Sequence, residues 1–462
     1  MPKNNLPKTH LLVPKDLHLY ELQNIYPACA LWLENKMEKQ IATYDLTIRD
    51  LPKNRNFLLF GGLEEVIQEI KQWKYTKAEI NYLLKQQLAT PKLAKYLSSF
   101  KFTGDLYAMP EGTAFFPGEP VIRITAPLLE GNLFSLFLMN SICSNTIFLS
   151  KLIRSKIAVK DKKLAFGGQR SHSFESGMKA TRAAYIAGID TGMPSFFKKY
   201  NIINPPKISL NAYHAVIKSF PTELDAMRSA AKLFPNRCRP MVDTYNFKQG
   251  IKNVIALSKE LKKENNSIAA ITIDSGDLAQ RALYARQKFD QAGFRNIKIT
   301  AASNLDEWKI DELVKKNIPI DNYVAVTELS TSSDDPKLEI VYKLVELRDR
   351  NKIKLCAKFA KNKISYPGKK QVFRIYKNNI SQTDIIGLED EKLGKLKLQK
   401  MISNGKLNYS LPTLDQIKEH VQNELKTLPK KLLDIEKQHK YKVQFSQKLK
   451  DLLEKARQEH TV

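Results

Sequence analysis

The chain is poor in cysteine, in tryptophan and in long apolar stretches. It has 462 residues but only four cysteines and three tryptophans. Cys29, Cys143, Cys238 and Cys356 lie far apart and form no C-x-x-C pair. This pattern argues against a zinc site or a disulfide framework and suits a reducing compartment. We therefore expect a cytoplasmic protein without a structural metal site.

Apolar runs long enough to cross a membrane are also missing from the sequence. None approaches the roughly 18 uninterrupted apolar residues of a membrane helix. The longest apolar patch, near residues 133–139, is broken by Ser135 and followed by Asn140, which is typical of a buried helix. Residues 1–5 lack the apolar centre of a signal peptide. We expect no membrane partner.

Acidic residues are scarce relative to basic ones. The chain has 75 Lys and Arg against 48 Asp and Glu, a formal charge of +27. Such a field attracts polyanions, whether nucleic acid, membrane surfaces or phosphorylated small molecules. Lysines scattered over a solvated surface would give the same excess. Because the sequence contains no basic motif interleaved with aromatic residues, a nucleic-acid partner ranks last.

The apolar residues that are present make up 43% of the chain and predict a sizeable core. Helical spacing predicts a helix over 17–39, and a capping box from Thr76 to Glu79 starts another. Residues 104–125 predict a small antiparallel β module. Further strands are expected at 340–347, 355–359 and 372–376, before a Lys-rich helical tail.

Between about residues 130 and 335, predicted helices, among them 133–158 and 247–262, alternate with short apolar strands. These strands lie at 164–166, 208–210, 241–242, 268–273, 297–301 and 323–326. Strand–helix alternation at this spacing predicts a parallel sheet. Its repetition over about 200 residues favours a closed β/α barrel, with an open doubly wound sheet as the alternative.

Polar side chains follow several predicted strands, at the end where a parallel barrel carries its function. Asp274 and Asp277 flank a Ser-Gly pair after one strand, and Asp243 follows another. Ser303 and Asn304 follow a third. Paired carboxylates can hold ribose hydroxyls or a magnesium–phosphate complex, and small polar residues before a helix can bind phosphate. Helix capping alone would explain the same residues.

Two further segments after strands carry candidate binding residues. Phe166, followed by two glycines, offers a stacking face that a ligand can approach, and Arg170 offers a charge. A plain Gly-Gly turn with a solvated arginine is the alternative. His214 also follows a strand, although a lone histidine is more often structural. His172 has no metal-ligand partner four residues on, so it indicates no zinc site.

Taken in order, these segments resemble the nicotinate phosphoribosyltransferase family from about residue 17 to residue 449. The matching segments are 51–57, 102–113, 243–245, 274–277, 302–304, 331–334, 341–346 and 367–372. The resemblance implies an irregular β/α barrel, residues 129–335, flanked by an α/β domain built from both chain ends, residues 1–128 and 336–462. It also implies a homodimer with active sites at the subunit boundary.

The reaction that the resemblance implies joins nicotinate to phosphoribosyl pyrophosphate and gives nicotinate mononucleotide and pyrophosphate. ATP hydrolysis assists through a phosphorylated histidine, and Mg²⁺ accompanies the phosphorylated substrates. This is the entry step for salvaging nicotinate into NAD.

The resemblance also implies roles for individual positions. Tyr20 resembles a tyrosine that stacks on the base from the neighbouring subunit, and Phe166 resembles the opposite stacking face. His214 resembles the phosphorylated histidine. Asp243 and Asp274 resemble carboxylates near the phosphoribosyl group and magnesium. Further substrate-binding positions are Arg170, Ser303 and Asn304.

The chain departs from the family pattern at several strand ends. Gln169 and Thr272 stand where the pattern has arginines. Val324 and Val326 replace glycines, and Glu328 replaces an arginine. Because these changes predict weaker phosphate binding, a second hypothesis is a catalytically weakened paralogue that binds a nucleotide or regulates a partner. A polyanion-binding protein is the third.

Overall fold

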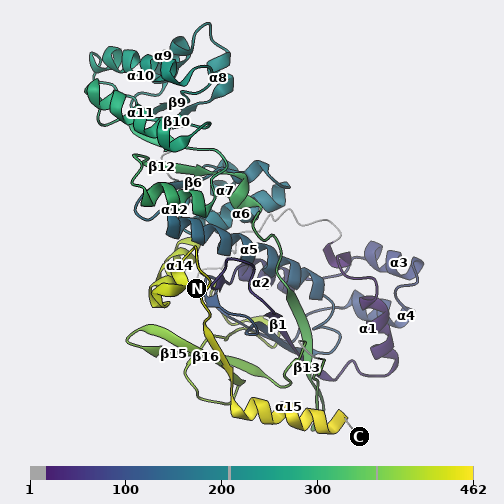
Figure 1. Ribbon diagram of the computed structural model, residues 1–462. Helices are drawn as coiled ribbons and strands as arrows, with labels where there is room; N and C mark the ends of the chain where they lie inside the picture. The colour runs from purple at the N-terminus through teal and green to yellow at the C-terminus, as the bar shows by residue number, and fades with distance from the viewer. Residues whose placement is uncertain (1–16, 206–209, 361–362, 461–462) are drawn as a thin grey trace, which may run out of the picture. The chain divides into compact units, whose positions relative to one another are not determined.

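The computed structural model describes residues 17–205, 210–360 and 363–460. The chain divides into two compact units, of which the first comprises Met1–Ser150 with Asp335–Val462 and the second comprises Lys151–Asp334. Figure 1 labels their helices and strands. The sequence placed the first boundary after residue 128, whereas the observed division falls later, inside α5 (Ser135–Ala158).

The first unit is built on a seven-stranded antiparallel sheet with the order β14-β13-β1-β5-β3-β18-β19. Its strands are β1 (Ile41–Ile48), β3 (Asp105–Ala108), β5 (Pro120–Pro127), β13 (Ile340–Asp349), β14 (Lys352–Leu355), β18 (Gln399–Ser403) and β19 (Lys406–Leu407). In this sheet β1 pairs with β5 on one side and with β13 on the other. Both chain ends therefore build one domain, as expected. The strand predicted at 355–359 is wrong, because β14 ends at Leu355.

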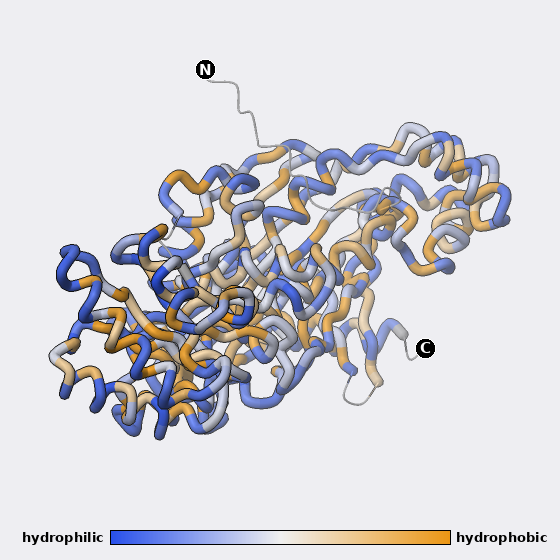
Figure 2. The backbone as a smooth tube through the Cα atoms, turned by 90° about the horizontal axis from the view of Figure 1, so that it is seen from above, coloured by the Kyte–Doolittle hydropathy of each residue, from blue (hydrophilic) through white to orange (hydrophobic). Residues whose placement is uncertain are grey.

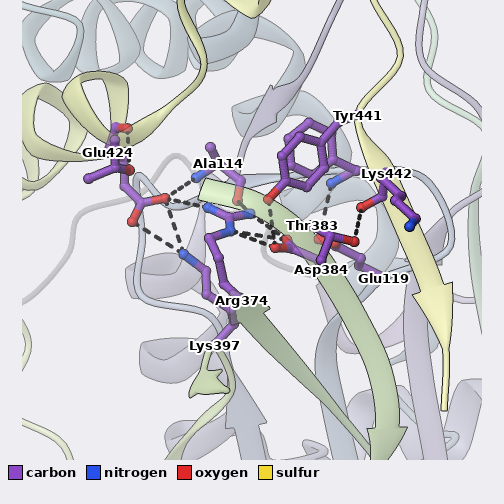
Figure 3. A network of polar contacts seen from close by, with 11 residues as sticks. Ala114, Glu119, Arg374, Thr383, Asp384, Lys397, Glu424, Tyr441 and Lys442 are labelled. Atoms are coloured by element: carbon purple, nitrogen blue, oxygen red, sulfur yellow. Dashed lines mark hydrogen bonds and ion pairs between the residues drawn. The ribbon is translucent and has the colours of Figure 1, made fainter. Parts of the chain in front are cut away.

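A four-stranded sheet in the same unit has the order β17-β15-β16-β20 and is held by a buried ionic network. Its strands are β15 (Lys370–Lys377), β16 (Ile380–Leu388), β17 (Lys395–Leu396) and β20 (Lys442–Phe445). The fully buried Arg374 donates to Asp384 at 2.6 and 2.8 Å and to Glu424, on α14 (Leu414–Thr427), at 3.1 Å (Figure 3). Lys397 reaches the same Glu424 carboxylate at 3.1 Å. Since every charge in this network is paired, its burial is tolerated.

Helices and two short strands complete the first unit. They are α1 (Ile25–Glu34), β2 (Leu58–Leu59), α2 (Leu63–Gln72), α3 (Lys77–Lys85), α4 (Pro91–Ser98), β4 (Ala114–Phe115) and α15 (Gln447–His460), of which α15 packs against β16 (Figure 1). The capping box predicted from Thr76 to Glu79 is present. The single helix predicted over 17–39 is wrong. Only the short η1 (Leu17–Leu19) and then α1 form there, because Pro27 can be accommodated in the first turn of a helix but not in its interior.

Seven parallel strands lie in the described part of the second unit. They are β6 (Lys163–Phe166), β7 (Asp190–Thr191), β8 (Leu210–Ala212), β9 (Cys238–Pro240), β10 (Ala270–Ile273), β11 (Lys298–Ala301) and β12 (Asn322–Ala325). Five pair in the order β10-β11-β12-β6-β7, β8 pairs with β9, and a parallel bridge from Met241 to Thr272 joins the two groups. A strand was predicted at 241–242, but the observed strand β9 lies just before these residues and ends at Pro240. Residues 208–209 of another prediction lie outside the described chain.

Helices follow most of these strands and produce the predicted β/α alternation. They are α6 (Phe174–Ile186), α7 (Pro194–Lys199), α8 (His214–Lys218), α9 (Glu223–Leu233), α10 (Phe247–Lys262), α11 (Leu278–Gln291), α12 (Glu307–Lys315) and α13 (Thr327–Ser330), with the short η2 (Gly168–Arg170) after β6. Each of the strands β10, β11 and β12 contributes a fully buried side chain, namely Ile271, Ile299 and Tyr323. The strand ends are thereby fixed beside one another.

One described helix, α5, is long and apolar enough by length and composition to cross a membrane, at the patch where the sequence predicts a buried helix. However, 72% of its most apolar window is buried inside the protein, as in the core helix of a soluble fold. Figure 2 shows that short apolar and polar stretches alternate along the backbone. The helix is therefore weak support for a membrane partner.

Candidate active site

Three neighbouring strand ends of the second unit bring together the three residues predicted to be catalytic. His214 begins α8 just after β8, Asp243 follows β9, and Asp274 follows β10. Nε2 of His214 lies 3.6 Å from Oδ2 of Asp274. The backbone N–H of Asp274 donates to Oδ2 of Asp243 at 2.8 Å. Residues distant in sequence thus form one polar cluster because they end adjacent parallel strands.

Asp243 is the most buried member of this cluster, with 1% of its side chain exposed. Its Oδ2 also accepts a hydrogen bond from Oγ of Ser275 at 2.6 Å, and Nη1 of Arg281 lies 3.5 Å away. Its Oδ1 is buried and has no hydrogen-bond partner among the described residues. An unpaired carboxylate oxygen at a buried position is costly unless a ligand or cation satisfies it.

His214 is oriented by a residue that the sequence did not single out. Its Nδ1 is hydrogen-bonded to Oγ1 of Thr244 at 2.9 Å, and 37% of its side chain is exposed. With Nδ1 engaged, Nε2 is directed toward Asp274. A histidine with one nitrogen fixed by a hydrogen bond presents the other in a defined orientation.

The carboxyl group of Asp274 has a raised pKa. Burial is the main cause, and the negative charge of Asp243 adds to it. The charge and hydrogen bond of His214, and the charge of Arg170, act in the opposite direction. Arg170 is exposed in η2, and its predicted contact with substrate stays a prediction.

A cavity of about 410 Å³ adjoins the strand ends of the second unit. It is lined by Lys163, Leu164, Ala165, Phe166, Gly167, Gln169, Asp190, Thr191, Gly192, Arg239, Asn322, Tyr323 and Val324. Phe166 is 3% exposed, so most of its ring packs against protein. A cavity of this volume is large enough for a small aromatic molecule.

Ser303 and Asn304 follow β11 and adopt unusual backbone conformations, with φ of +89° and +33°. The N–H of Ala302 donates to the carbonyl of Ile273 at 2.8 Å, which places this loop beside the residues after β10. Positive φ is uncommon for residues other than glycine and often marks a functional turn. The loop leads into α12, whose first turn is capped by Asp306.

Tyr20 belongs to the first unit and has 46% of its surface exposed. It follows η1 and precedes α1. Its predicted stacking on a base therefore stays a prediction.

The residues that depart from the family pattern lie around the cavity and the turn after it. A Cβ on Gly167 would meet Val324 and Val326 at 3.6 Å, so both valines pack beside this glycine. The carboxylate of Glu328 accepts a short hydrogen bond from Ser333 within its own loop. Gln169 lines the cavity and donates weakly, at 3.4 Å, to Oγ1 of Thr191.

Arg281 is a second residue that sequence reasoning missed. Its Nη1 donates to Oγ and to the carbonyl of Ser275, both at 2.9 Å, beside Asp243. A Cβ on Gly276 would meet the Arg281 guanidinium at 2.6 Å. The available signal was spacing, because Arg281 lies four residues after the N-cap Asp277 and therefore in the first turn of α11.

Within the described part of the chain, no group of three or more His, Cys, Asp and Glu side chains is arranged to hold a metal ion. The cluster offers two carboxylates, Asp243 and Asp274. Mg²⁺ is commonly held by one or two carboxylates together with substrate phosphates and water.

Comparison with known proteins identifies close relatives of this chain. Residues 19–143 match the nicotinate phosphoribosyltransferase N-terminal domain and residues 393–453 match the C-terminal domain. A nicotinate phosphoribosyltransferase of Mycobacterium tuberculosis is 30% identical over 420 residues, which cover 90% of this chain and 88% of that protein. One of Bacillus subtilis is 32% identical over 458 residues, covering 92% of each.

Solved structures show the same fold at lower sequence identity. The human nicotinic acid phosphoribosyltransferase superposes with a TM-score of 0.81 at 18% identity, covering 94% of this chain and 99% of that one. A nicotinate-nucleotide pyrophosphorylase of Pyrococcus furiosus gives a TM-score of 0.68 at 19% identity, covering 90% and 97%. The fold is therefore the irregular β/α barrel with a flanking α/β domain, and not an open doubly wound sheet.

Proposed function

Because the chain belongs to the nicotinate phosphoribosyltransferase family, we propose that it joins nicotinate to phosphoribosyl pyrophosphate, forming nicotinate mononucleotide and pyrophosphate with the assistance of ATP. The reaction salvages nicotinate for NAD synthesis. The observation that carries the proposal is the cluster of His214, Asp243 and Asp274 at three adjacent strand ends. These groups are those that a phosphoribosyl transfer with a phosphohistidine requires.

Asp243 and Asp274 stabilise the ribose during transfer. As the bond between the anomeric carbon and pyrophosphate breaks, positive charge develops on the ribose ring, and fixed carboxylates nearby lower the energy of that state. Oδ1 of Asp243, buried and unpaired, is suited to a ribose hydroxyl or a cation. Mg²⁺ carried in with the phosphates would be held by these two carboxylates and would offset the charge of the leaving pyrophosphate.

His214 accepts a phosphoryl group at Nε2. This nitrogen attacks the γ-phosphorus of ATP, the bond to the bridging oxygen breaks, and ADP leaves. Thr244 supports the role by fixing Nδ1, and Asp274 faces Nε2 at 3.6 Å. The exposed part of the ring leaves access for the nucleotide. Hydrolysis of the phosphohistidine supplies free energy that favours product formation.

The remaining predicted residues bind substrate. Phe166 lines the cavity and provides one aromatic face for the base. The protein is a cytoplasmic homodimer in which the partner subunit's Tyr20 provides the other face. Arg170, together with the loop of Ser303 and Asn304, binds the phosphates. The positive φ angles of that loop and its position before α12 favour backbone N–H contacts to an anion.

The proposal is tested by incubating purified protein with nicotinate, phosphoribosyl pyrophosphate and Mg²⁺, with and without ATP. We expect nicotinate mononucleotide to form, faster with ATP, and we expect His214→Ala to abolish the stimulation by ATP. Product no higher than in the His214→Ala control would contradict the proposal. Thermal shifts with phosphoribosyl pyrophosphate, nicotinate and nucleic acid separate it from a weakened paralogue and from a polyanion-binding protein.

A further inference from the structure

One face of the parallel strands in the second unit carries several polar residues, of which Arg239 and Asn322 line the cavity. Residues paired in a parallel register point to the same side of a sheet, and alternate residues of a strand share a face. The register therefore places on one face Asn211, Arg239, Thr272, Thr300 and Asn322. The opposite face carries the buried Ile271, Ile299 and Tyr323.

Arg239 is the outstanding charge on this polar face. It lies in the middle of β9 and lines the cavity together with Phe166 and Gln169. Its Nε is buried and has no hydrogen-bond partner among the described residues. Burial also lowers the pKa of its guanidinium. A desolvated guanidinium is unfavourable unless an anion accompanies it.

Unpaired acceptors lie next to Arg239 on the neighbouring strands. Oδ1 of Asn211, its register partner on β8, is buried without a partner among the described residues, and so is Oγ1 of Thr272 on β10. Asp190 lines the same cavity but is exposed to solvent. The cavity is therefore lined by a cation with an unsatisfied donor, and two unsatisfied acceptors lie on the neighbouring strands, as expected near a bound ligand.

The position of Arg239 relative to the acidic cluster defines what kind of ligand this is. Arg239 lies within β9, and Asp243 follows the end of the same strand. A molecule with its reacting atom at the cluster and its other end in the cavity would therefore approach Arg239. A planar aromatic acid, with a carboxylate on the ring carbon meta to the reacting nitrogen, carries both of these groups.

We propose that Arg239 binds the carboxylate of the aromatic base and makes the enzyme select an acid over the corresponding neutral amide. The inference rests on the proposed function and names the residue that sets its base specificity. It also gives a reason for Thr272, where the family pattern has arginine. In this chain the arginine on the polar face lies on β9, whereas the family pattern places an arginine on β10. An amide cannot neutralise the desolvated guanidinium, so it binds less well.

The test compares Arg239→Gln and Arg239→Lys with the exposed control Arg295→Gln. For Arg239→Gln we expect the KM for nicotinate to rise about 100-fold or more, since a buried charged pair loses one partner. We expect the KM for phosphoribosyl pyrophosphate to stay within about threefold and the preference for nicotinate over nicotinamide to shrink. Arg239→Lys should recover part of the preference, and Arg295→Gln should behave as wild type.

Folding and function are separated by two further measurements. Replacing a guanidinium whose buried Nε has no partner among the described residues should leave the melting temperature nearly unchanged, so a large loss of stability in both Arg239 variants would indicate a structural role and overturn the inference. An unchanged KM for nicotinate in Arg239→Gln would also overturn it while the proposed function stands. If the wild-type protein forms no product, the proposed function fails. Equilibrium dialysis of nicotinate then decides the inference, which requires binding by wild type that Arg239→Gln loses.

Discussion

Among His214, Asp243 and Asp274, Asp243 has the most hydrogen-bond partners. One carboxylate oxygen accepts hydrogen bonds from the backbone of Asp274 and from Ser275, and Arg281 approaches it. The other oxygen is buried and unpaired. The division suggests two roles for one residue. Oδ2 holds the loop after β10 in place, and Oδ1 is available to the substrate.

Asp243→Asn tests this division of roles. The amide keeps the size of the side chain but removes the charge, so we expect kcat to fall on the order of 10²–10³-fold, as when one stabilising group of a transition state is removed. The melting temperature should change little, because an amide oxygen can still accept from Asp274. Steady-state kinetics with Asp290→Asn, an exposed partner of Arg286, provide the matched control. Activity within threefold of wild type would exclude a catalytic role.

Some members of the cluster were predictable from sequence, and others were not. Asp243, Asp274 and His214 stand directly after apolar strands, a local pattern that is visible in one dimension. Arg239 lies inside a strand, where nothing local distinguishes it from a surface arginine, and Arg281 is marked only by its spacing after the N-cap Asp277. Their positions depend on strand register and on the packing of α11, which only the folded chain defines.

Helices and strands were predicted well where hydrophobic periodicity is long and uninterrupted. The predicted helix at 247–262 has the bounds of α10, and the one predicted at 133–158 begins two residues before α5. Short elements were missed, such as the two-residue β7, because so few residues show no periodicity. The helix predicted over 17–39 was wrong since Pro27 interrupts it.

Part of the segment 17–39, where the predicted single helix does not form, contacts the start of α5. Glu21, between η1 and α1, accepts hydrogen bonds from the N–H of Leu136 at 2.7 Å and from Oγ of Ser135 at 3.0 Å. It thereby caps the first turn of α5 from a distant part of the chain. Burial nevertheless raises the pKa of the Glu21 carboxyl to about 7, against these hydrogen bonds, which lower it.

The raised pKa of Glu21 predicts a pH-dependent contribution to stability. Between its usual pKa near 4.5 and about 7, the folded protein binds more protons at this site than the unfolded chain. Stability from this group is therefore lost as the pH rises through that window. Glu21→Gln has no carboxyl group that titrates at this position. The difference in unfolding free energy, wild type minus variant, should therefore fall by about 1–3 kcal/mol between pH 4.5 and pH 8.

Denaturant unfolding at several pH values measures this difference. Glu419→Gln, at an exposed position on α14 in the same unit, provides the control and should follow wild type at every pH. A difference between Glu21→Gln and wild type that does not vary with pH would show that Glu21 is ionised in the same way in the folded and unfolded chains.

The molecule as a whole is assembled from distant parts of the chain. Its seven-stranded sheet needs β1 and β13, which the whole second unit separates in sequence. Local patterns can predict each strand, but pairing across such a distance cannot be inferred from them. Only the resemblance to a known family implied it, and the comparisons confirmed the fold.

Subunit mixing tests the largest-scale proposal, a homodimer whose sites each combine His214, Asp243 and Asp274 of one chain with Tyr20 of the other. Tyr20→Ala and Asp243→Asn should each be nearly inactive as pure proteins. When they are unfolded together and refolded in equal amounts, random pairing makes half of the dimers mixed, and each mixed dimer has one site with both native residues. About a quarter of wild-type activity should therefore return. Refolding each variant alone is the control. A mixture no more active than the average of its components would place Tyr20 and Asp243 of the same chain in one site, or exclude Tyr20 from the site altogether.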